Sequence, residues 1–240
     1  MCGSCEGDHA GRRDFLKFGA TGLALAATTG VLAPARAAGG QATTLSPDQA
    51  LAALKSGNER YVSNPKLCSI DLAGQRATLA AHQAPWATII ACADSRVPPE
   101  LIFGGRGLGE LFVARNAGNL VDTATLGTVE YGAAVLGSPL IVVLAHTRCG
   151  AVKAACDVIG KNATYPGAIG PMIEPILPAA LAAKGEPGDF VDNTARQSAR
   201  RTAKRLPAAS TVIAGLVAQG KVKIVPAIYD LGAGVVTYLG

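Results

Sequence analysis

The stretch Trp86-Ala87-Thr88-Ile89-Ile90-Ala91 is an apolar run rich in β-forming residues, and it leads directly into Cys92-Ala93-Asp94-Ser95-Arg96. A second run of this kind, Leu140-Ile141-Val142-Val143-Leu144-Ala145, leads into His146-Thr147-Arg148-Cys149. Short, uninterrupted apolar runs are typical of strands that are buried on both faces of a parallel sheet. The two stretches therefore predict two central strands, each with reactive side chains at its carboxyl end.

The rest of the chain alternates between helical and extended patterns. Ser46-Pro47-Asp48-Gln49 has the form of a capping box with proline at the first helical position, and it opens a predicted helix that ends near Val62. Further helices are predicted within 63–85 and over 123–136, 150–156, 171–184, 189–205 and 210–219, and further strands over 111–114, 222–228 and 235–239. Strands that alternate with helices indicate an α/β fold, in which a mainly parallel central β-sheet is flanked by helices and carries an antiparallel edge strand near the C-terminus.

Cys92, His146 and Cys149 carry the donor atoms that zinc prefers in proteins. Because open α/β sheets place their ligands at the carboxyl ends of parallel strands, these three side chains can converge on one ion and leave its fourth position open for chemistry. Cys149 also opens a predicted helix, whose N-terminal partial charge favours the thiolate form. The alternative is a closed structural site or a set of buried thiols. A closed site would need a fourth Cys or His, and His82 is the only other histidine after residue 37.

The combined motifs resemble those of the β-class carbonic anhydrases. Cys-x-Asp-Ser-Arg followed by His-x-x-Cys matches the signature of that family, and the likeness extends over residues 46–240. Four further segments agree with it in order and spacing: 57–61 (GNERY), 97–100 (VPPE), 109–119 (GELFVARNAGN) and 228–230 (IYD). The resemblance implies an enzyme with one Zn²⁺ per chain, which converts CO₂ reversibly to bicarbonate and a proton through zinc-bound hydroxide.

The resemblance also implies a catalytic role for Asp94 and Arg96. In the family, the arginine holds the aspartate away from the metal, and the aspartate accepts a hydrogen bond from the zinc-bound water. In some members the aspartate instead becomes a fourth metal ligand and closes the site. Asp94 is therefore predicted to orient the water or to lock the site, depending on Arg96.

Gln83, Phe112, Tyr131 and Gly150 match the substrate pocket of the plant-type branch of that family. Gln83 stands nine residues before Cys92, as does the glutamine that hydrogen-bonds the substrate in that branch. Taken singly, Phe112 and Tyr131 are more often packing residues. Their joint match makes all four predicted substrate-binding residues.

Three other positions differ from the sequence pattern of that family or of one of its branches. The regulated branch of the family has Trp three residues before the first ligand, where this chain has Ile89. Ala145 stands where the family usually has Gly, so an extra methyl group lies next to His146. Ala117 replaces a larger apolar pocket residue. The last two changes affect the shape of the pocket and remove no catalytic group.

The first 37 residues resemble a twin-arginine export signal. Arg12-Arg13 precedes an apolar run over 18–32, and Ala35-Arg36-Ala37 has the pattern of a cleavage site. The run is too short and too rich in small residues to be a stable membrane anchor. The predicted organisation is a cleaved signal over 1–37, a linker over 38–45 and a single domain over 46–240. The twin-arginine machinery is then a partner, and the mature chain is exported, as to a bacterial periplasm.

Several cysteines and one histidine lie outside the predicted metal site. Cys2 and Cys5 with His9 either bind a metal before cleavage or belong incidentally to the signal. Cys68 and Cys156 either form a disulfide after export or remain buried as apolar fillers. His82 is the one candidate for a proton relay, and an exposed loop histidine is the alternative.

Composition and resemblance together define the expected partners. The net charge of +5 is scattered, and basic residues do not interleave with aromatic ones, so nucleic-acid binding has little support. The resemblance implies CO₂ and bicarbonate as ligands and a homodimer or higher homo-oligomer with pockets at the subunit boundary. Two alternatives are a carbon disulfide or carbonyl sulfide hydrolase on the same scaffold and a non-catalytic periplasmic zinc-binding protein. Asp94 and Arg96 favour an enzyme, because metal storage does not require a water-orienting pair.

Overall fold

A computed structural model describes residues 42–64 and 72–240. The predicted export signal over 1–37, which includes Cys2, Cys5 and His9, lies outside the described residues, as do linker residues 38–41 and Cys68. Export and a disulfide between Cys68 and Cys156 therefore stay predictions. Within the described ranges, no helix combines the length and the apolar character needed to span a membrane.

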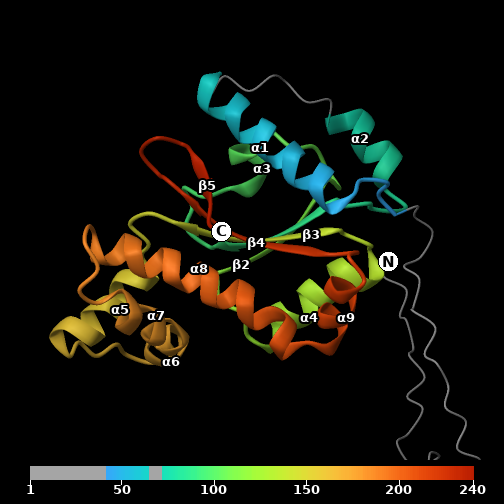
Figure 1. Ribbon diagram of the computed structural model, residues 1–240. Coiled ribbons are helices and arrows are strands. Elements are labelled where there is room, and N and C mark those ends of the chain that lie inside the picture. The colour runs from blue at the N-terminus through green and yellow to red at the C-terminus, as the bar shows by residue number, and fades with distance from the viewer. Residues whose placement is uncertain (1–41, 65–71) are drawn as a thin grey trace, which may run out of the picture. The chain divides into compact units, whose positions relative to one another are not determined.

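A five-stranded sheet forms the centre of the fold, in the order β2-β1-β3-β4-β5 (Figure 1). The strands are β1 (Ala87–Cys92), β2 (Leu111–Asn116), β3 (Leu140–His146), β4 (Lys223–Tyr229) and β5 (Val236–Tyr238). The first four run parallel to their neighbours, and β5 pairs antiparallel with β4. The structure thus confirms the predicted α/β fold with a mainly parallel sheet and an antiparallel edge.

Helices cover both faces of this sheet. On one side lie α1 (Pro47–Ser63), α2 (Leu72–Leu79) and α3 (Pro99–Ile102), as Figure 1 shows. The other side holds α4 (Thr123–Glu130), α5 (Gly150–Lys161), α6 (Ile169–Ile173), α7 (Leu177–Ala183), α8 (Phe190–Ala209) and α9 (Thr211–Ala218). Because both faces are covered, every residue of β1 and of β3 is buried, which explains their uninterrupted apolar sequences.

The side chains of β1 and β3 alternate between two hydrophobic cores. Ile90 and Val143 pack into the core beneath α5, α7 and α8, whereas Ile89 and Val142 pack into the core beneath α1. A strand presents successive residues to opposite faces, so one run of apolar residues supplies both cores. This arrangement fixes the carboxyl ends of β1 and β3 beside each other.

The first helix is attached to the rest of the domain through Asn58. The predicted capping box is present, with Ser46 and Gln49 exchanging hydrogen bonds at the start of α1. Asn58 is buried, and its Nδ2 donates to the carbonyl oxygens of Ile102 and Gly234 over 3.0 and 2.9 Å. Its Oδ1 accepts a hydrogen bond from the amide of Val236 over 2.8 Å. One side chain therefore links α1 to α3 and to the final hairpin.

The predicted helices differ from the observed ones mainly near proline and at their ends. The helix expected over 171–184 is divided into α6, a 3₁₀ turn at Glu174–Ile176 and α7. Pro175 and Pro178 lie at these breaks, where their missing amide protons do not interrupt a continuous helix. The helix expected over 123–136 is α4 followed by a π-helical turn at Tyr131–Val135. The short helix α3 was not predicted, because its four residues show no helical period.

Candidate metal site

The three predicted metal ligands meet at one edge of the sheet. Cys92 is the last residue of β1, His146 is the last residue of β3, and Cys149 is the N-cap of α5. Because β1 and β3 are adjacent in the sheet, one donor atom from each of the three residues lies within 4.8 Å of the other two. All three side chains are buried, and the two Sγ atoms are 3.9 Å apart.

The imidazole of His146 is arranged as a metal ligand. Its Nδ1 is 2.9 Å from the carbonyl oxygen of Thr147, and a carbonyl can only accept, so Nδ1 carries the proton. Its Nε2 is buried and has no hydrogen-bond partner within 42–64 and 72–240. A buried polar atom without a partner is costly unless a ligand satisfies it. The unpaired Nε2, facing two thiols, therefore fits a zinc ion.

The two thiols do not titrate independently. The pKa of Cys92 is lowered, first because the Cys149 thiol donates a hydrogen bond to it, and further by His146 and by the amide of Gly118 at 3.3 Å. The pKa of Cys149 is raised by the same shared hydrogen bond and by burial. A divalent cation bound to both sulfur atoms would require both thiols to be deprotonated.

The turn between His146 and Cys149 is held from two sides. The Thr147 amide donates to the Tyr229 carbonyl oxygen over 2.9 Å, and the Thr147 Oγ1 accepts from the Leu231 amide over 3.0 Å. Arg148 has a φ of 54°, a left-handed conformation that a residue with a side chain adopts at some cost. Its amide donates to Asp192 Oδ1 in α8 over 2.8 Å. These contacts, which the sequence did not reveal, bring Cys149 back toward His146 within three residues.

Asp94 and Arg96 form a bidentate pair at the rim of the cluster. Arg96 Nε donates to Asp94 Oδ1 over 2.9 Å, and its terminal nitrogen donates to Oδ2 over 2.7 Å. The guanidinium of Arg96 thereby holds the pKa of Asp94 well below its usual range. Asp94 Oδ2 lies 3.9 Å from His146 Nε2, so the carboxylate adjoins the proposed metal position without occupying it.

Arg115 and Gly118 support the loop that carries Cys92 and Asp94. Arg115 Nε donates to the carbonyl oxygen of Cys92 over 2.9 Å, and its terminal nitrogen donates to that of Asp94 over 2.7 Å. Gly118 has a φ of 85°, and a Cβ there would lie 3.0 Å from Ile176 Cδ1. Only glycine therefore brings its amide to Cys92 without strain. Sequence reasoning placed both residues in a family-like segment but gave neither a role.

Three of the four predicted substrate-binding residues lie at the opposite end of the sheet within the chain. Phe112 pairs with Thr88, whereas Cys92 pairs with Asn116, so the two pairs are about 13 Å apart along the strands. Tyr131 belongs to the same end, because its ring lies 6.1 Å from that of Phe112. Gln83 also belongs to the amino end, because it precedes β1 in the chain.

Gly150 is the one predicted substrate-binding residue beside the ligands. It begins α5 directly after Cys149, and a Cβ placed on it would meet no atom within 4 Å. The structure therefore provides open space next to the metal ligands at this position.

The remaining predicted residues lie away from the ligand atoms or are enclosed. His82 is partly exposed and lies between α2 and β1, at the amino end of the sheet. Ala145 is buried and pairs with Ile228 in β4. Cys156 is buried and forms no disulfide with a cysteine of the described ranges, and its Sγ lies 3.3 Å from Thr194 Oγ1. Its surroundings fit the buried-filler alternative.

The sequence of this chain is similar to that of known proteins. Residues 87–236 match a protein family described as carbonic anhydrase. Carbonic anhydrase 2 of Mycobacterium tuberculosis is 40% identical over 188 residues, which cover 78% of this chain and 90% of that protein. A carbonic anhydrase of Mycolicibacterium smegmatis is 38% identical over 188 residues, covering 78% and 91%.

Solved structures with a similar fold point the same way. One of two tetrameric β-carbonic anhydrases of Sordaria macrospora aligns with this chain with a TM-score of 0.62 and 26% identity. The alignment covers 79% of this chain and 96% of the Sordaria chain. The β-carbonic anhydrase of Coccomyxa, in complex with acetazolamide, aligns with a TM-score of 0.60 and 26% identity, covering 82% and 87%.

Proposed function

This chain belongs to the β-class carbonic anhydrases, and from that premise we propose that it is a zinc enzyme that converts CO₂ reversibly to bicarbonate and a proton. The observation that carries the proposal is the unpaired, buried Nε2 of His146 between two thiols, with the Asp94–Arg96 pair at its rim. A metal store would need the donors alone. A restrained carboxylate beside them supports catalysis.

The thiolates of Cys92 and Cys149 and the Nε2 of His146 would hold one Zn²⁺ per chain. Zinc at this position is a Lewis acid that lowers the pKa of water, so that a nucleophile is available near neutral pH. The chain's own contribution is to enclose the donors and fix the imidazole tautomer through Thr147.

Asp94 is suited to orient a water molecule rather than to remove its proton. Its pKa is held low by Arg96, so the carboxylate stays ionised and is a poor base at neutral pH. Both of its oxygens accept hydrogen bonds from Arg96, which fixes the carboxylate plane. Oδ2 nevertheless adjoins His146 and can accept one more hydrogen bond from a water beside the ligands.

Gly150 would hold the developing product. The first amides of a helix lack partners within the helix, and the Gly150 amide forms no hydrogen bond within the described residues. The open space beside Gly150 admits CO₂, and its amide can donate to an oxygen that becomes negatively charged. The lack of a side chain is therefore functional here.

The other pocket residues are proposed to come from a second copy of the chain. Gln83, Phe112 and Tyr131 cannot reach the ligands of their own chain, because they lie at the far end of the strands. A two-fold pairing can place the amino end of one sheet against the carboxyl end of another. Tyr131 is 46% exposed, as expected for an aromatic side chain that a partner covers. The Sordaria enzymes, which are described as tetrameric, support an oligomer.

Subunit complementation would test this shared pocket. Two chains, one with Gln83→Ala and one with Cys149→Ser, are purified as a heterodimer by two different tags. One of its two sites then contains intact ligands and an intact glutamine, so we expect about half of the wild-type hydration rate. Each homodimer should be strongly impaired.

The matched control pairs the Gln83→Ala chain with a chain that carries both substitutions. This heterodimer has no site with both components intact and should show no recovery. Equal activity of the two heterodimers would show that each pocket is built within one chain.

The proposed activity itself is tested by stopped-flow CO₂ hydration on the zinc-loaded chain, with metal content measured on the same sample. We expect one zinc per chain and rapid hydration. Hydrolysis of carbonyl sulfide or carbon disulfide without CO₂ hydration would favour the sulfur-substrate alternative. Bound zinc with neither activity would favour a non-catalytic zinc protein.

A further inference from the structure

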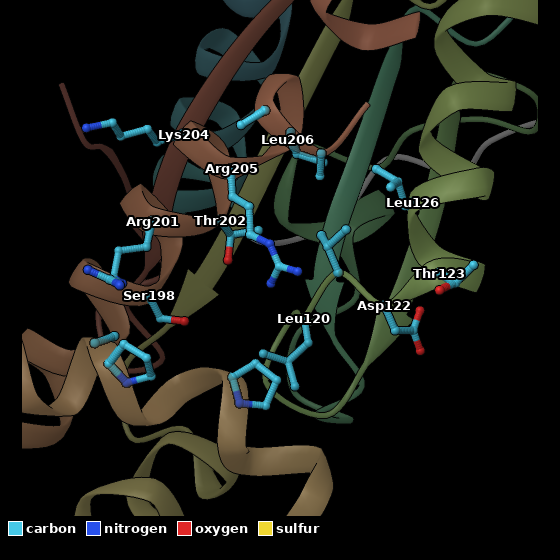
Figure 2. Close-up of a pocket in the computed structure, with 16 residues that line it drawn as sticks. Leu120, Asp122, Thr123, Leu126, Ser198, Arg201, Thr202, Lys204, Arg205 and Leu206 are labelled. Carbon is cyan, nitrogen blue, oxygen red and sulfur yellow. The ribbon is translucent and has the colours of Figure 1, made fainter. Parts of the chain in front are cut away.

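A cavity of about 790 Å³ lies between α8, the start of α4 and the segment around α7 (Figure 2). Its volume falls within the range of small-molecule sites. None of the metal ligands and none of the predicted substrate-binding residues lines it. The proposed hydration reaction therefore leaves this cavity without a role.

One wall of the cavity is polar and positively charged. Ser198, Arg201, Thr202 and Arg205 lie on one stripe of α8, because residues three and four apart share a helix face. Figure 2 shows the guanidinium of Arg205 reaching into the cavity, near the hydroxyl groups of Ser198 and Thr202. The ammonium group of Lys204 points away from the centre.

These donors have no partners within the chain. Neither Arg201 nor Arg205 forms an ion pair or a side-chain hydrogen bond within 42–64 and 72–240. Ser198 is only 5% exposed, yet its hydroxyl forms no hydrogen bond with any described residue. The Ser198 hydroxyl is therefore free to donate to a ligand in the cavity.

One carboxylate, Asp122, also lines the cavity and does not cancel the charge of the wall. Its Oδ1 accepts a hydrogen bond from the Thr125 amide over 2.8 Å, as the N-cap of α4. That amide lowers the pKa of Asp122, so its negative charge is already stabilised there. Arg201 and Arg205 thus line the cavity without a paired anion, and Figure 2 shows that the guanidinium of Arg205 points into it whereas that of Arg201 points away.

The opposite wall is apolar. Leu120 and Leu126 face the arginine stripe from the side of α4. Pro175 and Pro178 also line the cavity. A purely inorganic ion would leave this wall without contacts. A ligand that satisfies both walls has a charged head and a hydrocarbon body.

We propose that this cavity binds a small organic phosphate monoester. The forked guanidinium of Arg205 and the hydroxyls of Ser198 and Thr202 supply enough donors for the three free oxygens of a phosphate, whereas a carboxylate has only two oxygens. The phosphate lies against these three side chains, and the organic group packs on the leucine and proline wall.

Isothermal titration of the full, zinc-loaded chain tests the proposal with phenyl phosphate as probe and with inorganic phosphate and benzoate as comparisons. We expect saturable binding of phenyl phosphate that is stronger than that of either comparison. The double variant Arg201→Gln/Arg205→Gln should lose at least about tenfold in affinity, because charge-assisted hydrogen bonds contribute at least that much each.

The matched control is Arg200→Gln, on the same helix but outside this cavity. It should bind phenyl phosphate as the unaltered chain does. Three results would each overturn the proposal. The first is binding of phenyl phosphate that survives the double substitution, as binding at the metal would. The second is an equal affinity for phenyl phosphate and inorganic phosphate. The third is the absence of saturable binding together with a changed oligomer mass in the double variant.

Discussion

Replacing His146 with alanine is expected to abolish zinc retention and to lower kcat/KM for CO₂ hydration by at least about a thousandfold. The imidazole supplies one of three donors, and its Nε2 is buried without any other partner among the described residues. Metal content by mass spectrometry and stopped-flow hydration on the same preparation measure both effects.

The matched control for this variant is His82→Ala, which changes the other histidine among the described residues. His82 lies at the amino end of the sheet, so this variant should retain one zinc per chain. Cys149→Ser tests the same ligand set with a smaller structural change, because it replaces one donor atom and almost preserves the side-chain volume. A loss of zinc in this variant is therefore not explained by misfolding. Stoichiometric zinc in both His146→Ala and Cys149→Ser would contradict the assigned ligand set.

Replacing Arg96 with glutamine is expected to lower kcat/KM roughly tenfold to a hundredfold while zinc is retained. Arg96 makes two side-chain hydrogen bonds to Asp94. Without them only the backbone amide of residue 96 holds Oδ1, and Oδ2 can turn toward His146 Nε2, 3.9 Å away. Substitution with cobalt(II) provides a spectroscopic signature, because a fourth protein ligand changes its visible absorption. Asp94→Asn should lower the rate similarly without that change.

The same variant has a predicted effect on acid stability. Arg96 depresses the pKa of Asp94 in the folded chain, so the pair contributes stability above the ordinary carboxyl pKa of about 3.9. That contribution disappears as the pH falls through the depressed pKa. Arg96→Gln should therefore reduce the free energy of unfolding at neutral pH, and the stabilities of the two proteins should converge in strong acid.

The control is Arg148→Gln, which also removes one positive charge near the site. The Arg148 side chain makes no hydrogen bond to Asp94, and its amide donates to Asp192. Equal losses in both variants would show a general charge effect.

The sheet and the metal ligands could be predicted from the sequence because both depend on local patterns. Two fully buried strands require uninterrupted apolar runs, and parallel strands bring their carboxyl ends together. The supporting contacts could not be predicted in this way. Arg115 reaches from β2 to the loop after β1, and Asp192 reaches from α8 to Arg148. Such contacts join residues distant in the chain and leave no periodic signal.

The substrate pocket shows a different limit of sequence reasoning. Gln83, Phe112 and Tyr131 were identified by resemblance, which implies pockets at the subunit boundary but does not say which subunit supplies each residue. Strand register separates Phe112 from Cys92 and so raises the question of a partner. The arginine stripe on α8 is a further example, because the lack of partners for its donors is evident only in three dimensions.

The contacts of Thr147 have a consequence for the order of events in synthesis. All three zinc donors are translated before β4, yet Thr147 is held by Tyr229 and Leu231, which follow much later in the chain. A nascent polypeptide therefore carries every donor before the turn between His146 and Cys149 has its final supports. We therefore expect the proposed metal site to become rigid only when β4 docks, which would couple secure metal capture to completion of the chain.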